Sequence, residues 1–193
     1  MASLKDLFIS KVRVKLIKVF LGKPQEIFYV RELVRLTGEE INAVRRELMR
    51  MEEKGIAAKE ERGNRIYYHI RREYLFYNEL IRLAAKTTGL GQAIIKNKNK
   101  IGKISFAFIT GRLVRHRPHR GDDVDLLIVG DVVLPQLSAV ISRFESEMKR
   151  EINYSAMNKD EFEFRKKRRD PFILKILAQS RVMLIGDEEE MPD

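Results

Sequence analysis

Residues 37–55 read TGEEINAVRRELMRMEEKG and decide how the first half of the chain folds. Thr37 followed three residues later by Glu40 has the form of a capping box, which predicts a helix that begins near Gly38. Gly55 is typical of the residue that follows a helix C-terminus. The apolar residues between these signals repeat at helical spacing, and we expect them to form the buried face. They are Ile41, Val44, Leu48 and Met51.

The opposite face of this helix carries side chains that suit the major groove of DNA. They are Asn42, Ala43, Arg46 and Arg50, with Arg45 on the flank. Arginine can form two hydrogen bonds with guanine, asparagine can do so with adenine, and a small alanine permits close approach. For an isolated helix, the better interpretation is a solvated face whose arginines pair with nearby glutamates such as Glu47. The segments on either side therefore decide between the two interpretations.

Those segments predict a definite order of elements. Residues 4–21 place apolar residues at helical intervals, and Gly22-Lys23-Pro24 ends that helix. An extended piece at Ile27–Val30 leads into a short helix at Arg31–Leu36. After Gly55, two strand-like runs at residues 56–61 and 65–70 are joined by Arg62-Gly63-Asn64, and this spacing predicts a β-hairpin.

In this order, the run FYVRELVRLTGEEINAVRRELMRMEEKGIAAKEERGNRIYYHI (residues 28–70) resembles the winged helix-turn-helix domain of ArsR-like and MarR-like transcriptional regulators. The resemblance covers residues 5–71. It implies that the helix at residues 39–53 is the recognition helix and that Arg62 and Arg65 form the wing. It also implies double-stranded DNA as the partner.

A further helical pattern runs from Glu73 to Lys86, with Leu75, Phe76, Leu80, Ile81 and Ala84 as its apolar residues. It suits a core helix and equally the helix of a homodimer. Residues 87–90 break the pattern, and the basic stretch at residues 96–100 is typical of a linker or a frayed helix end that could touch the DNA backbone. We therefore expect a winged-helix domain at 1–72, a connecting helix and linker at 73–102, and a second domain at 103–193.

The second domain is expected to alternate strands and helices. We expect strands at residues 104–109, 123–129, 151–157 and 181–187, and helices at residues 135–149, 159–168 and 171–178. Within it, RGDDVDLLIVGD (residues 120–131) places Asp123 and Asp125 two residues apart, at the start of an apolar run. In a strand, such residues point to the same side. They are either a metal site or the polar end of a core strand.

Residues 103–190 resemble a minimal nucleotidyltransferase domain of the polymerase-β type. The resemblance assigns the glycine turn to Gly111, the metal-binding pair to Asp123 and Asp125, and the third carboxylate position to Asn153. In that family the carboxylates hold two magnesium ions, which align the attacking and leaving oxygens. Three departures stand out: Arg112 and Asp122 replace serines of the motif, and Asn153 lacks the charge of a carboxylate.

The loop after the glycine turn, RLVRHRPHR (residues 112–120), is unusually basic through Arg112, Arg115, Arg117 and Arg120. Its arginines either pair with the aspartates in place of metal ions or grip DNA phosphates. With these departures, we expect a catalytically degenerate domain that requires no cofactor. The alternative is an active, Mg²⁺-dependent nucleotidyltransferase of the antitoxin kind, acting on protein or RNA. A third possibility is an architectural protein that binds DNA without sequence preference.

Composition supports a DNA-binding function and excludes other classes of protein. The chain has 193 residues, a formal net charge of +10, no cysteine and three histidines. The positive charge favours a polyanionic partner, and the missing cysteines exclude disulfides and thiolate metal sites. No apolar run is long enough for a membrane span. We therefore expect a cytoplasmic α+β protein with two domains, a winged helix followed by a nucleotidyltransferase-like α/β domain.

Overall fold

The computed structural model describes residues 8–117 and 123–191, and its fold class is α+β, as predicted. The chain divides into two compact units, Met1–Thr87 and Thr88–Asp193, called unit 1 and unit 2 below. Two residues named above, Arg120 and Asp122, lie outside the described residues, as does the start of the helix expected at residues 4–21.

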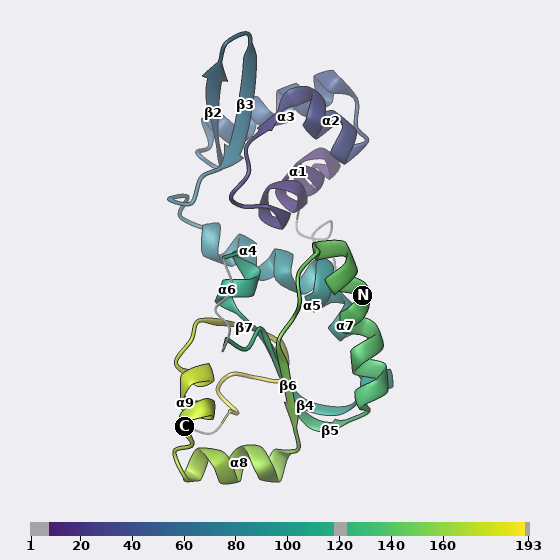
Figure 1. The fold of residues 1–193 in the computed structure, drawn as a ribbon. Coiled ribbons are helices and arrows are strands. Elements are labelled where there is room, and N and C mark those ends of the chain that lie inside the picture. The colour runs from purple at the N-terminus through teal and green to yellow at the C-terminus, as the bar shows by residue number, and fades with distance from the viewer. Residues whose placement is uncertain (1–7, 118–122, 192–193) are drawn as a thin grey trace. The chain divides into compact units, whose positions relative to one another are not determined.

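Unit 1 combines four helices and a three-stranded antiparallel sheet within the described residues (Figure 1). In chain order its elements are α1 (Lys11–Gly22), β1 (Phe28–Tyr29), α2 (Val30–Thr37), α3 (Ile41–Glu53), β2 (Ala57–Arg62), β3 (Arg65–Ile70) and α4 (Tyr77–Thr87). The strands lie in the order β1-β3-β2. The sheet thus consists of the β2–β3 hairpin and one short strand, β1, that precedes α2.

The first helix begins later than its sequence pattern suggested. Residues 8–10 are not helical, and the side chain of Ser10 accepts a hydrogen bond from the backbone N–H of Arg13 at 3.2 Å. This N-cap fixes the start of α1 at Lys11, because it satisfies a donor that the helix itself leaves unpaired. The expected end at Gly22 is confirmed.

The corner between α2 and α3 corrects the predicted capping box. The Thr37 hydroxyl donates to the carbonyl of Leu33 at 2.7 Å, within its own helix, so Thr37 is the last residue of α2. Gly38 follows in the left-handed region, with φ 64°. The cap of α3 is instead Glu40, and the helix begins at Ile41. The prediction failed because a hydroxyl can bond the preceding turn as well as the following one.

The end of α3 and the hairpin agree with the sequence. Gly55 has φ 70°, its N–H donates to Glu52, and the N–H of Ile56 donates to Met51 at 2.8 Å. This is the Schellman arrangement, in which glycine is favoured. The hairpin pairs Arg62 with Arg65 across a two-residue turn.

Residues 73–102, which were expected to form a connecting helix and a linker, form parts of both units instead. Leu75 and Phe76 are exposed and precede α4, whereas Leu80, Ile81 and Ala84 are buried as expected. The stretch at residues 96–100 is the second half of a helix, α5 (Gly89–Ile101). It stays helical because Ile94 and Ile101 are fully buried on one side of it. The basic residues occupy the side that faces solvent.

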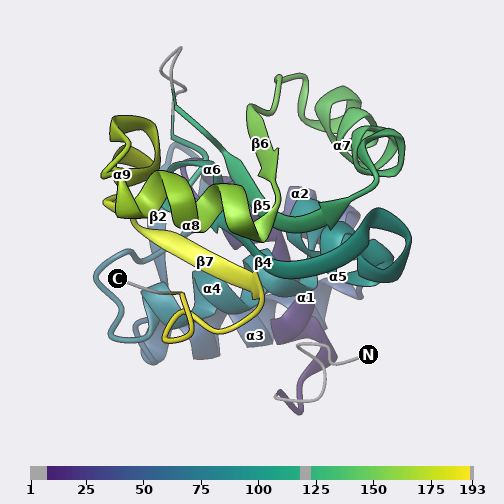
Figure 2. The same cartoon turned by 90° about the horizontal axis from the view of Figure 1, so that it is seen from below.

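Unit 2 is built on a four-stranded mixed sheet. After α5 its elements are β4 (Gly102–Thr110), α6 (Gly111–Val114), β5 (Leu126–Val132), α7 (Leu134–Met148), β6 (Tyr154–Met157), α8 (Lys159–Lys167), α9 (Pro171–Leu177) and β7 (Arg181–Ile185). The strand order is β6-β5-β4-β7, as Figure 2 shows. Only the β5–β6 pair is parallel.

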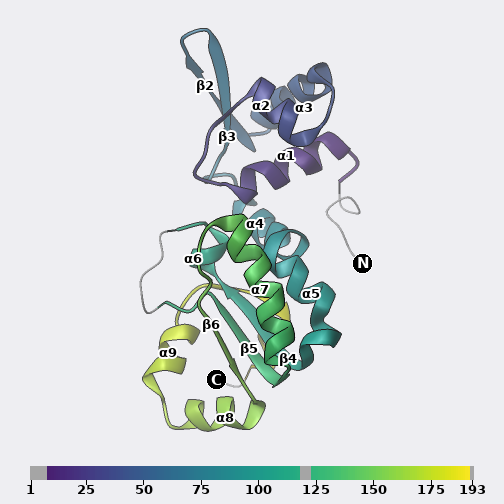
Figure 3. The same ribbon diagram turned by 45° about the vertical axis from the view of Figure 1, so that its right-hand side comes forward.

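Helices cover both faces of this sheet, with α5 and α7 on one side and α8 and α9 on the other (Figure 3). Alternate residues of β5 serve the two faces, since successive strand side chains point in opposite directions. Leu127 and Val129 join the core beneath α8 and α9, together with Phe108 of β4 and Phe162 of α8.

Two strands begin later than the sequence suggested. β5 starts at Leu126 instead of Asp123, and β6 starts at Tyr154 instead of Glu151. The polar residues before each strand are held by one another and by arginines, so they form a separate cluster at this end of the sheet. Asp125 and Asn153 meet there, with the Asp125 N–H donating to the Asn153 carbonyl at 2.7 Å.

Candidate functional site

The exposed face of α3 contains the residues that the sequence analysis assigned to DNA contact. Asn42, Arg45, Arg46 and Arg50 are exposed, and Ala43 is half-buried. The sequence analysis missed Met49, which is 63% exposed in the middle of this face. Its helical spacing from Arg45 and Arg46 was the available signal. An apolar side chain there could contact a thymine methyl group.

A buried glutamate holds α3 against α1. Glu47 accepts hydrogen bonds from the Ser10 hydroxyl at 2.9 Å and from Arg13 Nε at 2.5 Å. The sequence analysis had considered Glu47 as a surface partner for the arginines of α3. Its side chain instead points into unit 1, and Arg50 approaches it only to 3.9 Å. Glu47 therefore orients the helix.

The other glutamates near α3 also leave its exposed face positive. Glu52 pairs with Lys59 at 3.5 Å, and Glu53 is 3.6 Å from Lys54. Within the described residues, Arg45 and Arg46 form no salt bridge. This arrangement argues against a solvated face of internally paired charges.

Glu40 closes the N-terminus of α3. Its carboxylate accepts from the backbone N–H groups of Asn42 at 2.8 Å and Ala43 at 3.0 Å. These hydrogen bonds lower the pKa of Glu40, and the positive charges of Arg46 and Arg45 lower it further. The Glu40 cap therefore fixes the first turn of α3, which contains Asn42.

The hairpin tip orders its two arginines with aromatic rings. The Arg65 guanidinium lies 5.5 Å from the centre of the Tyr29 ring, and that of Arg62 lies 5.7 Å from the Tyr67 ring. Arg62 also bonds Glu60 at 2.9 Å, which raises the pKa of Arg62 and lowers that of Glu60. Glu60 would therefore compete with a phosphate group for the guanidinium of Arg62. The sequence did not single out Glu60.

Two depressions separate α3 from the hairpin. One, of about 830 Å³, has Met49, Ile66 and Tyr68 among its lining residues. The other, of about 500 Å³, brings a further cation, Arg31 of α2, beside Arg45 and Arg65. Arginines from three different elements therefore border one hollow, and a phosphate group is the anion that such planar donors suit.

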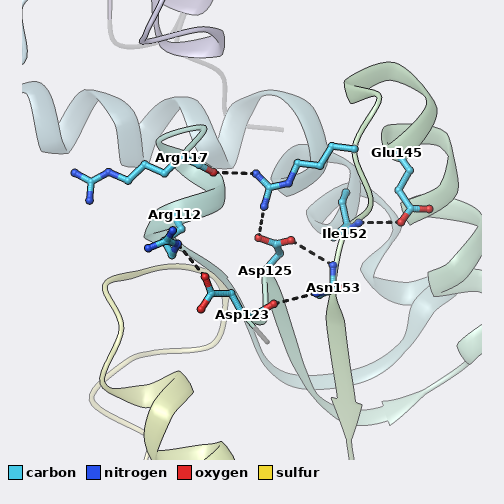
Figure 4. Close-up of polar contacts among 8 residues, drawn as sticks. Arg112, Arg117, Asp123, Asp125, Glu145, Ile152 and Asn153 are labelled. Atoms are coloured by element: carbon cyan, nitrogen blue, oxygen red, sulfur yellow. Dashed lines mark hydrogen bonds and ion pairs between the residues drawn. The ribbon is translucent and has the colours of Figure 1, made fainter. Parts of the chain in front are cut away.

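In unit 2 the structure brings together the three residues assigned to the nucleotidyltransferase-like site. Figure 4 shows Asp123, Asp125 and Asn153 side by side. The Asn153 amide donates to the Asp123 carbonyl at 3.2 Å, and the Asn153 N–H lies 3.3 Å from Asp125 Oδ2. Glu151 is exposed and lies before the strand on which the sequence analysis placed it.

Both carboxylates are neutralised by arginines. Arg112 Nε lies 3.0 Å from Asp123 Oδ2, as the pairing interpretation of the basic loop expected (Figure 4). The partner of Asp125 was missed: it is Arg150, whose Nη2 is 2.8 Å from Asp125 Oδ1. Within the described residues no group of three acidic or histidine side chains could hold a metal ion. Each of the two aspartates thus has an arginine beside its carboxylate.

Gly111 lies against the segment that precedes β7. Its N–H donates to the Ser180 carbonyl at 2.6 Å, and an added Cβ would lie 2.1 Å from Ser180 Oγ. Because glycine has no Cβ, the segment around Ser180 can approach the backbone of Gly111 this closely.

Beyond Arg112, the other described arginines of the basic loop do not reach the aspartates, and Arg117 is exposed (Figure 4). Arg115 lies 3.4 Å from Ser180 Oγ, and the carbonyl of Arg117 accepts from Arg150 at 3.3 Å. Arg120 lies outside the described residues. Within the described part of the loop, Arg112 thus fits the interpretation of internal pairing, whereas the exposed side chain of Arg117 leaves phosphate contact open as a prediction.

A scan of the chain against protein-family models found no match, and searches of curated proteins and of solved structures found no significant match. None of the helices in the described part of the chain is long and apolar enough to cross a membrane.

Proposed function

We propose that this protein is a DNA-binding transcriptional regulator in which unit 1 is a winged helix-turn-helix. In this proposal α3 enters the major groove as the recognition helix and the β2–β3 hairpin is the wing. The element order of unit 1 and the sheet order β1-β3-β2 support the assignment. Double-stranded DNA is the proposed partner.

The observation that carries the proposal is the contrast between the two sides of α3. Glu47 is buried and bonded to Ser10 and Arg13, so it fixes the helix on the unit. Arg45 and Arg46 face outward without a salt bridge to any described residue. Because exposed arginines in a fixed orientation can bond base edges and phosphates, this face is suited to reading DNA.

The distribution of charge agrees with DNA contact through unit 1. Residues 1–87 contain 19 lysines and arginines against 12 aspartates and glutamates, whereas residues 88–193 contain 19 against 16. A positive excess attracts DNA through the release of counterions from its phosphates.

Unit 2 is proposed to be a nucleotidyltransferase-like domain without catalytic activity. Arg112 and Arg150 neutralise Asp123 and Asp125, and Asn153 supplies no third charge. Among the described residues, no third acidic or histidine side chain joins Asp123 and Asp125 in a group that could hold a metal ion.

The test is the affinity of the full chain for a random-sequence DNA duplex, measured by fluorescence anisotropy at several salt concentrations. Arg45→Ala/Arg46→Ala should lower the affinity and reduce the salt slope by up to about 2. Arg82→Ala/Lys86→Ala, on exposed positions of α4, removes the same charge from the same unit and is the matched control. Equal losses in both variants would contradict a role for α3.

A further inference from the structure

Five consecutive basic residues, Arg165 to Arg169, cross the C-terminus of α8 in unit 2. Arg165 is paired, with Nη2 lying 2.8 Å from Glu161 and Nη1 lying 3.8 Å from Asp170. Lys167, Arg168 and Arg169 are exposed, and within the described residues none of these three forms a salt bridge. We call these three residues the α8 basic tip.

The helix dipole accounts for only part of this run. Cations in the last turn of a helix are stabilised by the partial negative charge of its C-terminus. Arg168 is the C-cap, however, and Arg169 already lies beyond the helix. The basic run therefore extends beyond the last turn of α8, where interaction with the helix dipole would stabilise it.

The backbone of Arg169 gives a second, independent observation. Its φ is 52°, in the left-handed region. Its N–H donates to Lys166 and the N–H of Asp170 donates to Arg165, each at 2.9 Å, so Arg169 occupies the Schellman position that favours glycine. Glycine would fold here with less strain, so backbone conformation does not explain why this position is an arginine.

An aromatic ring lies beneath the basic tip. Phe164 is 56% exposed, and the Arg168 guanidinium lies 4.6 Å from the centre of its ring. Phe164, Lys167 and Arg168 follow one another at helical spacing, so they share a face of α8. A guanidinium that lies over a ring is restrained by the cation–π attraction, and its N–H groups can still bond a phosphate.

We propose that the α8 basic tip binds the sugar-phosphate backbone of a nucleic acid and gives unit 2 a contact of its own. The proposal does not depend on α3, which belongs to the other unit. An anionic lipid surface is less well matched. The apolar side chains of α8 are Phe162, which is buried in the core, and Phe164, so the helix has no continuous apolar face for a bilayer.

The experiment compares two variants of the full chain that are matched in charge and in backbone. Arg169→Gly removes one cation from a left-handed position that follows α8. Lys149→Gly does the same at the C-cap of α7, where the exposed Lys149 has φ 50°. Both should raise Tm by about 2–4 °C, because glycine relieves the left-handed backbone. Only Arg169→Gly should weaken binding to nucleic acid.

Binding is measured on a random-sequence duplex of about 40 base pairs and on an oligothymidine of similar length, each over a range of salt. We expect Arg169→Gly to reduce the salt slope by up to about 1 and Lys167→Gln/Arg168→Gln/Arg169→Gly to reduce it by up to about 3, with an affinity loss of about tenfold or more. A loss of affinity on the duplex alone identifies double-stranded nucleic acid as the ligand, and a loss on the oligothymidine alone identifies a single strand. An unchanged affinity in both arms would overturn the proposal. So would equal losses of affinity for Lys149→Gly.

Discussion

Arg150 Nη2 lies 2.8 Å from Asp125 Oδ1, and this ion pair closes the polar end of the unit 2 sheet. The Asp125 side chain is 2% exposed and that of Arg150 is 21% exposed. The second oxygen of Asp125 faces the Asn153 N–H at 3.3 Å. A carboxylate this deeply buried needs a compensating charge, and the chain supplies it with an arginine from the segment between α7 and β6.

Removing that arginine should destabilise the protein strongly. Arg150→Met removes the positive charge beside the buried Asp125, and breaking a buried ion pair in this way typically lowers the free energy of unfolding by about 3–5 kcal/mol. Asp125→Asn combined with Arg150→Met should recover much of the loss, because the uncompensated charge is gone. Urea denaturation followed by circular dichroism measures both. A loss below about 1 kcal/mol for Arg150→Met would show that the pair is not needed for stability.

The same cluster should neither bind metal tightly nor transfer nucleotides. We expect no incorporation of labelled nucleotide into protein or RNA with Mg²⁺ or Mn²⁺. Arg112→Ser/Asn153→Asp frees Asp123 and adds a third carboxylate, so this variant should bind Mn²⁺ more tightly than the parent chain in a paramagnetic titration. Robust transfer by the parent chain that is abolished by Asp123→Asn would contradict the assignment of unit 2.

The hairpin offers a variant that should strengthen DNA binding. Glu60 competes with phosphate for Arg62, so Glu60→Gln should raise the affinity for all sequences alike and steepen the salt dependence. Arg62→Ala should do the reverse, weakening all sequences alike. Glu26→Gln, which removes an exposed carboxylate elsewhere in unit 1, is the control. If Glu60→Gln and its control have the same effect, Arg62 does not contact DNA.

Glu40 should make the stability of unit 1 depend on pH. Its pKa in the folded protein lies below the ordinary value of 4.5, because its carboxylate accepts the N–H groups of Asn42 and Ala43. The stabilisation is therefore present above pH 4.5 and is lost as the pH falls through the lowered pKa. Glu40→Gln should lower Tm at neutral pH and leave it unchanged in acid. An equal effect of the mutation at both pH values would rule out the charge as its cause.

Local signals predicted much of unit 1. Glycines at helix ends and the alternation around Tyr68 and Ile70 identify α3 and the hairpin from neighbouring residues alone. The start of α3 was misplaced because the Thr37 hydroxyl has two possible acceptors, and only the tertiary structure selects between them.

The pairing around the unit 2 cluster could be predicted only in part. The proximity of Asp123 to Asp125 and of Arg112 to both is visible in the sequence, and pairing of the loop arginines with the aspartates was one of its two interpretations; the structure shows this pairing for Arg112 and Asp123. Arg150 is 25 residues from Asp125, and its role depends on where the segment before β6 turns. The burial of Glu47 could not be predicted either, because its partners Ser10 and Arg13 lie more than 30 residues away in the sequence.

The most direct test of DNA reading by α3 is the selection of bound sequences from a random duplex pool by the full chain. We predict an enriched motif, and we predict that Asn42→Ala and Arg46→Ala each reduce discrimination between that motif and random DNA by about 1–3 kcal/mol. Arg82→Ala should leave the motif and its discrimination unchanged. No enriched motif, or equal losses on specific and random DNA for the α3 variants, would contradict sequence reading by this helix.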